Sequence, residues 1–180
     1  MNAEIDISKV VIHTERLTLR QWTIDDLNDF YEYASVDGVG QMAGWLPHKN
    51  IEESRAILLN FIEGKKTFAI EFNGKVIGSL GIERYNEEQL PEYSEKRGRE
   101  IGYVLSKNYW GRGLMPEAVK AVINYLFDRV KLDFIVCGHF TDNMQSMRVQ
   151  EKCGFKHYKL EKYTTHYGEV KDSWISVLER

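Results

Sequence analysis

Two glycines, Gly111 and Gly113, stand in the stretch YWGRGLMPEA, which leads into a run with helical periodicity. The other expected helix starts carry a side chain that accepts hydrogen bonds from free amides, whereas this one has Met115 in front of Pro116. The glycines permit a tight turn, so the amides from Arg112 onward can converge at the positive end of the helix dipole. The stretch therefore predicts a phosphate site, with water on an exposed helix end as the alternative.

The same turn lacks the features of two common nucleotide-binding motifs. A P-loop has Lys and Ser or Thr after its last glycine, but Leu114 and Met115 follow Gly113 here. A dinucleotide-binding fingerprint needs a third small residue where Pro116 stands, and it follows a parallel strand rather than the antiparallel strands expected here. The turn therefore argues against nucleotide hydrolysis and against NAD binding.

Periodicity and turn residues predict the order of the elements around this turn. Apolar alternation and short apolar runs predict strands at 16–22, 68–72, 76–85, 100–105, 134–139, 155–163 and 174–178. Helical stripes predict helices from Thr23, from Asn50 to Gly64, from Pro116 to about Arg129, and from Asp142 or Asn143 to Gly154. Asn73-Gly74 predicts a hairpin. This order predicts an α/β (mixed α+β) fold, with a central mixed, mostly antiparallel sheet, one parallel pair and about four flanking helices.

Length and composition indicate a single domain over residues 1–180. The chain is 43% hydrophobic, has only three prolines and carries a formal net charge of −3. Because no apolar run approaches the roughly 18 residues of a membrane span and no signal-like start is present, we expect a cytoplasmic protein without membrane contact. The charge excludes a general basic field, so we expect no nucleic-acid partner. Cys137 and Cys153 form no ligand pattern and the histidines are scattered, so we expect buried thiols and no metal site.

Two motifs resemble those of a known family. The stretch from Tyr109 to Ala118, together with NMQSMRVQEKCGF at residues 143–155, resembles the GNAT superfamily of acetyl-CoA-dependent N-acetyltransferases. The resemblance runs from about Thr14 to the closing KDSWISVLER and matches the expected order of elements. The most similar branch looks like the ribosomal-protein N-terminal acetyltransferases. The resemblance implies the GNAT-type fold, one acetyltransferase domain and acetyl-CoA as the cosubstrate.

The resemblance also implies where coenzyme A binds. The pyrophosphate would be held by the turn and the helix start, which contain Gly111, Arg112, Gly113, Leu114 and Met115. The backbone of Tyr103, Val104 and Leu105 would pair with the pantetheine arm like an added strand, and Asn143 would bind the arm from the other side. The physics agrees, because the pantetheine amides satisfy a splayed strand edge and the pyrophosphate satisfies an uncapped helix start.

Acetyl transfer to an amine needs a neutral amine, a stabilised oxyanion and a proton for the leaving thiolate. Many relatives place a tyrosine acid where Gln150 stands here, so Ser146 of the Asn-x-x-Ser pattern is the candidate acid; a serine that bonds the preceding turn is the alternative. Glu100 is the first candidate base and Glu83 the second, and a solvated strand-end charge is the alternative for each. The backbone amide near Val104 is the candidate oxyanion donor.

The acceptor amine is poorly specified by the sequence. The branch resemblance implies a protein N-terminal α-amine, whereas the same scaffold accepts small molecules such as polyamines, amino sugars and antibiotics. A non-catalytic acetyl-CoA-binding module is a further alternative, and the C-terminal strands offer an edge for a homodimer. We expect segments 35–49 and 87–96 to flank the acceptor. Four carboxylates of the second segment would attract a cationic acceptor, with an ordinary solvated acidic loop as the alternative: Glu87, Glu88, Glu92 and Glu95.

Overall fold

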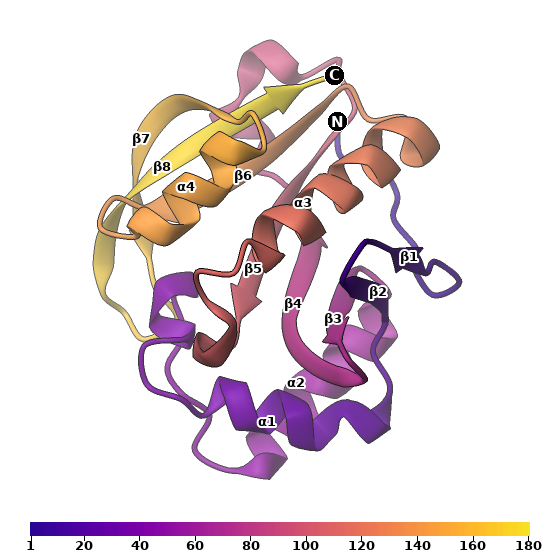
Figure 1. Cartoon of the computed structure of the whole chain (residues 1–180). Helices are drawn as coiled ribbons and strands as arrows, with labels where there is room; N and C mark the ends of the chain where they lie inside the picture. The colour runs from indigo at the N-terminus through magenta and orange to yellow at the C-terminus, as the bar shows by residue number, and fades with distance from the viewer.

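A computed structural model describes residues 1–180 and contains one eight-stranded sheet in the order β1-β2-β3-β4-β5-β6-β8-β7 (Figure 1). The strands are β1 Ile12–His13, β2 Leu17–Gln21, β3 Thr67–Phe72, β4 Lys75–Glu83, β5 Gly98–Leu105, β6 Phe134–Phe140, β7 Lys156–Thr164 and β8 Val170–Glu179. The helices are α1 Leu27–Ala34, α2 Ile51–Gly64, α3 Leu114–Tyr125 and α4 Met144–Lys152. Only β5 and β6 pair in parallel, so the predicted mixed α+β fold with one parallel pair is confirmed.

Apolar side chains cover both faces of the sheet. Figure 1 shows α3 and α4 lying over one face, where Leu80 of β4 and Val119 of α3 belong to the largest cluster. On the opposite face, Ala69 of β3 clusters with residues of α1 and α2. At the other end of that face, Phe134 of β6 clusters with Tyr93 of the loop after β4. Because these two apolar clusters are separate, the part of the sheet that lies between them is free to form a site.

Most local signals appear where the sequence predicts them. The Asn50 side chain caps α2, and the Asn143 side chain caps α4 by accepting the amide of the residue three positions ahead at 3.1 Å. The Asn73-Gly74 turn joins β3 and β4 with positive φ at both residues. The end of α2 differs in detail, because Lys65 takes the left-handed conformation (φ 50°), whereas Gly64 is the last helical residue.

The start of α3 lies earlier than predicted. The helix begins at Leu114, with Gly113 in the left-handed conformation at the cap position and no side-chain cap. Met115 and Pro116 are therefore part of the first turn, where proline is tolerated because the first amides have no intrahelical acceptor. The predicted lack of a side-chain cap is confirmed, although the residue at the cap is glycine rather than methionine.

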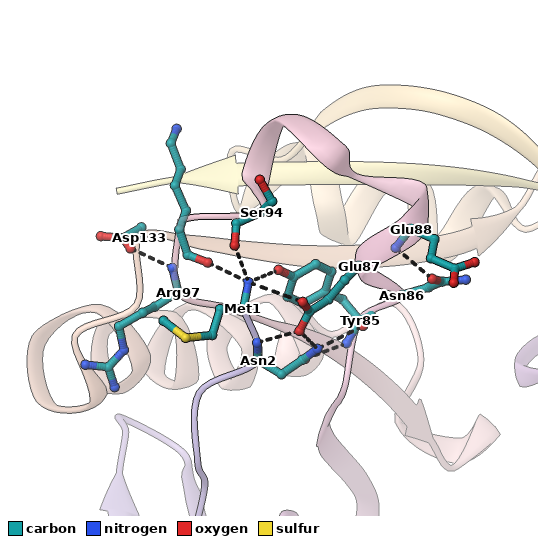
Figure 2. Close-up of polar contacts among 10 residues, drawn as sticks. Met1, Asn2, Tyr85, Asn86, Glu87, Glu88, Ser94, Arg97 and Asp133 are labelled. Atoms are coloured by element: carbon teal, nitrogen blue, oxygen red, sulfur yellow. Dashed lines mark hydrogen bonds and ion pairs between the residues drawn. The ribbon is translucent and has the colours of Figure 1, made fainter.

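The first residues of the chain hold the loop that follows β4. Asn2 forms a bridge with the start of β5, and its side-chain amide donates to the Tyr85 carbonyl at 3.1 Å and to the Glu87 carboxylate at 2.9 Å. Figure 2 shows the Met1 nitrogen beside the Tyr85 hydroxyl and the Ser94 carbonyl, which it contacts at 3.3 Å. The Glu87 carboxylate is therefore occupied by the first residues of the chain.

Candidate active site

Strands β5 and β6 separate halfway along β5. Their parallel ladder joins Gly98–Ile101 to Phe134–Cys137, and no pairing continues beyond it although both strands do. The backbone of residues 102–105 and that of residues 138–140 therefore face each other across a gap. Unpaired strand edges present amide and carbonyl groups that an extended, amide-containing ligand can satisfy.

Gln150 of α4 satisfies part of the β6 edge at this gap. Its Nε2 atom donates to the Gly138 carbonyl at 3.0 Å, and its Oε1 atom lies 3.0 Å from Nδ1 of His139. Burial lowers the pKa of His139, which favours a neutral ring that donates from Nδ1. Gln150 is only 3% exposed. Both polar atoms of this buried side chain are therefore bonded to residues of β6.

A cavity of about 960 Å³ follows the gap. All of the residues singled out from the sequence for coenzyme binding or catalysis line it, with the exception of Arg112. The turn at Gly111 and Gly113 forms one end, Tyr103 and Ser146 lie along the middle, and Glu100 lies at the other end. Segments that are far apart in the sequence therefore line one cavity.

The glycine turn leaves its end of the cavity open to an anion. Gly111 and Gly113 have φ values of 74° and 73°, a region that residues with a Cβ rarely adopt. A Cβ on Gly111 would meet no atom within 4 Å, so the conformation rather than crowding requires glycine there. The Arg112 guanidinium lies over the Tyr109 ring, 5.3 Å from its centroid. The first amides of α3 have no side-chain partner and can bind an anion at the positive end of the helix.

Three carboxylates gather at the opposite end. Glu83 and Glu100 are direct partners in the β4–β5 ladder, and Glu161 of β7 lines the same cavity. Burial, followed by repulsion from Glu161 and Glu83, raises the pKa of Glu100 to about 7. Glu83 is paired with Lys66, and Glu161 accepts a hydrogen bond from Gln89 at 2.6 Å. Glu100 therefore changes charge near neutral pH.

The carboxylates expected to attract the acceptor lie elsewhere. None of the four glutamates of segment 87–96 lines the cavity. Glu87 binds Asn2, and Glu92 accepts a hydrogen bond from the Tyr158 hydroxyl. These four carboxylates therefore do not form the cavity wall, and their attraction for a cationic acceptor stays a prediction. Glu161 was not predicted from the sequence. The only feature that could have indicated it is that it is the single acidic residue in a lysine-rich alternating segment.

Ser146 lies in the first turn of α4 and bonds across the gap. Its Oγ atom is 3.0 Å from the Tyr103 hydroxyl of β5, which also lies 3.3 Å from the Ser146 carbonyl oxygen. Burial raises the pKa of Tyr103 well above its usual range, so the phenol keeps its proton. The partner of the seryl oxygen is thus a strand residue rather than the preceding helical turn. Asn143 holds this turn, because its Oδ1 atom accepts the Ser146 amide.

Alternation along β5 separates these groups onto two sides of the sheet. Glu100 and Val104 point to the face opposite α3 and α4, since side chains two residues apart share a face. Val104 packs against the cluster of α1 and α2 on that face. Tyr103 points to the α4 face, where its hydroxyl meets Ser146. The ionisable carboxylate and the hydroxyl pair therefore approach the gap from opposite sides.

The two cysteines of the chain form no disulfide. Cys137 is buried in the wall and Cys153 is half-buried, and both are free thiols whose pKa is raised by burial. No three His, Cys, Asp or Glu side chains are grouped in a way that could hold a metal ion. None of the helices has the length and apolar composition that crossing a bilayer requires.

Comparison with known proteins identifies the family. Residues 16–156 match the family model described as an acetyltransferase (GNAT) domain. An uncharacterized N-acetyltransferase, YoaA of Bacillus subtilis, is 30% identical over 171 residues, which cover 91% of this chain and 93% of YoaA.

Solved structures share the fold over nearly the whole chain. A GNAT-family acetyltransferase from Bacillus anthracis has a TM-score of 0.81 and 25% identity, covering 94% of this chain and 98% of that one. The self-immunity acetyltransferase MccE for microcin C7, solved with acetyl-CoA and AMP, has a TM-score of 0.76 and 19% identity, covering 93% and 94%. A ribosomal-protein-S5-alanine acetyltransferase from Vibrio fischeri has a TM-score of 0.72 and 20% identity, and the match covers 95% of this chain and 97% of that one. The splayed strands, the uncapped turn and these matches agree, and the chain belongs to the GNAT family of N-acetyltransferases.

Proposed function

We propose that this GNAT enzyme transfers the acetyl group of acetyl-CoA to the α-amine of a peptide or protein N-terminus. The observation that supports this choice of acceptor is the buried position of Glu100 opposite Glu83 and in the same cavity as Glu161, which raises the pKa of Glu100 to about 7. An α-ammonium group has a pKa near 8, so passing its proton to Glu100 costs about 1.4 kcal/mol. A lysine-type ammonium has a pKa near 10.4, and the same transfer costs roughly 5 kcal/mol. Glu100 is therefore matched to an α-amine.

Acetyl-CoA fits the residues that line the cavity. The amides of the turn from Gly111 to Met115 would hold its pyrophosphate, and Arg112 would add charge by leaving its stack on Tyr109. The free edge of β5 at residues 103–105 would pair with the pantetheine amides, and Asn143 would line the arm from α4. When bound, the cosubstrate supplies a thioester and a thiol leaving group. That the fold neighbour MccE was solved with acetyl-CoA supports this assignment.

The two faces of β5 divide the chemistry. Glu100 accepts the proton of the acceptor ammonium on one face, directly or through one water molecule. Glu83 is the second candidate, although its carboxylate is already paired with Lys66. The Val104 amide donates a hydrogen bond to the oxygen that becomes negative in the transition state. On the other face, the Ser146 hydroxyl donates to the sulfur as it leaves.

A small-molecule amine is the second candidate acceptor. The carboxylates of Glu83, Glu100 and Glu161 in one wall favour it, because they would attract a second positive charge, as in a polyamine or an aminoglycoside. Such an acceptor needs no room for a peptide chain. The two candidates differ in which nitrogen receives the acetyl group, and this difference can be measured.

The test uses one peptide that carries a free α-amine and an internal lysine, offered together with spermidine and an aminoglycoside. After incubation with acetyl-CoA near pH 7.5, tandem mass spectrometry locates the acetyl group. We expect it on the peptide α-amine. Acetylation confined to lysine, spermidine or the aminoglycoside would overturn the proposed acceptor and leave the GNAT chemistry in place.

A further inference from the structure

Arg16 and Glu117, which are 101 positions apart in the sequence, form a dense set of contacts at the start of α3. The Arg16 Nε and NH2 atoms each lie 2.7 Å from Oε2 of Glu117, and the Arg16 amide donates to Oε1 at 2.8 Å. Thr14 adds a hydroxyl bond to Oε1 at 2.6 Å. The Glu117 carboxylate is thus fully engaged by the segment between β1 and β2.

The third nitrogen of Arg16 reaches the glycine turn. Its NH1 atom donates to the Arg112 carbonyl at 2.9 Å. Because a trans peptide is planar, its N–H points opposite to its C=O, so this bond turns the Gly113 amide away from Arg16. The next carbonyl, that of Gly113, accepts the Glu117 amide at 3.3 Å. The carbonyls of Arg112 and Gly113 are therefore tied back, which leaves the amides of the turn free for an anion.

We propose that Arg16 and Glu117 form a latch that holds the glycine turn in its phosphate-binding conformation, which makes Arg16 a positioning residue for coenzyme A. This inference rests on the proposed binding of acetyl-CoA in the cavity. The latch contributes little to overall stability, because the Arg16 side chain is 40% exposed and exposed ion pairs stabilise weakly. Its effect is on the orientation of the turn.

Charge is the second part of the role. Glu117 lies in the first turn of α3, beside the expected pyrophosphate, and hydrogen bonds from Thr14 and Arg16 lower its pKa against the effect of burial. An unpaired carboxylate there would repel the phosphates. Arg16 offsets this charge through its ion pair with Glu117. It also holds the turn through a carbonyl, so the amides of the turn stay available to the phosphates.

The experiment compares two acetyl donors, acetyl-CoA and S-acetylpantetheine, which lacks the pyrophosphate. For Arg16→Leu we expect the KM for acetyl-CoA to rise about 10-fold, the effect of one lost hydrogen bond to a charged group, with kcat nearly unchanged. The kcat/KM for S-acetylpantetheine should stay at the wild-type value. Arg20→Leu is the matched control, since Arg20 lies in the adjacent strand β2 and pairs with Asp26 and Glu71. It should lower Tm without changing the preference between donors.

Glu117→Gln separates the latch from a direct phosphate contact by Arg16. The latch predicts weaker coenzyme A binding by calorimetry, even though the substitution removes a negative charge near the phosphates. Tighter binding in this variant would mean that Arg16 is itself a ligand and would overturn the latch. An equal loss with both donors in Arg16→Leu, or no loss with either, would also overturn it. If the wild-type protein fails to bind coenzyme A, the proposed function falls together with the latch.

Discussion

Replacing Glu100 with glutamine removes the ionisable group on which the proposed chemistry depends while keeping the size of the side chain. Burial and the neighbouring carboxylates raise the pKa of Glu100 from an ordinary value of 4.5 to about 7. In Glu100→Gln we expect kcat/KM for an α-amine peptide to fall about 100-fold at pH 7.5, the lower range for loss of a general base. Wild-type kcat/KM should rise with pH through about 7 as Glu100 ionises, and the variant should lack this limb.

The same substitution changes stability in a pH-dependent way. A carboxyl group whose pKa is raised in the folded state stabilises the protein fully below its unfolded pKa, and this contribution is lost as pH rises through the folded pKa. Between pH 5.5 and about 7, wild type loses about 2 kcal/mol, at about 1.4 kcal/mol for each pH unit, and the glutamine variant does not. For a chain of this length the Tm of the variant should gain about 4 to 8 °C on wild type over that range.

Two assays check the reasoning independently of each other. Initial rates from pH 5.5 to 9 measure how kcat/KM rises with pH. Thermal unfolding over the same range measures the difference in Tm between wild type and Glu100→Gln. Glu161→Gln should move the catalytic limb to lower pH, because it removes one of the repulsions that raise the Glu100 pKa. If wild type and Glu100→Gln show the same pH dependence in both assays, the assignment of Glu100 is refuted. Glu63→Gln, in an exposed position of α2, controls for loss of a carboxylate.

Two further predictions concern the hydroxyl pair and the glycine turn. Ser146→Ala and Tyr103→Phe should each lower kcat about 10-fold with little change in the KM for acetyl-CoA. The double variant should be no slower than either single variant, because the two hydroxyls act through one hydrogen bond. Additive losses in a double-mutant cycle would contradict this. Gly113→Ala should weaken coenzyme A binding measured by calorimetry about 10-fold, whereas Gly74→Ala, which has a similar φ in a hairpin far from the cavity, should lower Tm comparably without changing affinity. Equal affinity in the two glycine variants would show that the turn does not hold the phosphates.

Local signals in the sequence predicted the frame of the site. The Asn73-Gly74 hairpin and the Asn143 cap depend on residues close together in the chain, so their conformations follow from short-range chemistry. The uncapped start of α3 was predicted for the same reason. Its position was two residues late, because a proline is tolerated throughout the first helical turn and marks no single position.

The contacts that adjust the site could not be predicted in this way. Glu161 affects Glu100 because β7 and β8 follow β6 in the order β6-β8-β7, which alternation along one strand does not reveal. The Tyr103–Ser146 bond and the Arg16–Glu117 pair join segments that lie far apart in the sequence. Each depends on the way the sheet and the helices pack, and only the structure contains that information.

The most direct test of the central claim is mass spectrometry of purified protein incubated with acetyl-CoA and a mixed pool of N-terminal peptides, polyamines, amino sugars and aminoglycosides. Parallel reactions with Glu100→Gln show whether any product depends on the proposed base. We expect acetylated peptides, modified on their α-amines, that form far more slowly with the variant. Acetylation of small amines alone, or a product that forms equally fast with the variant, would contradict it.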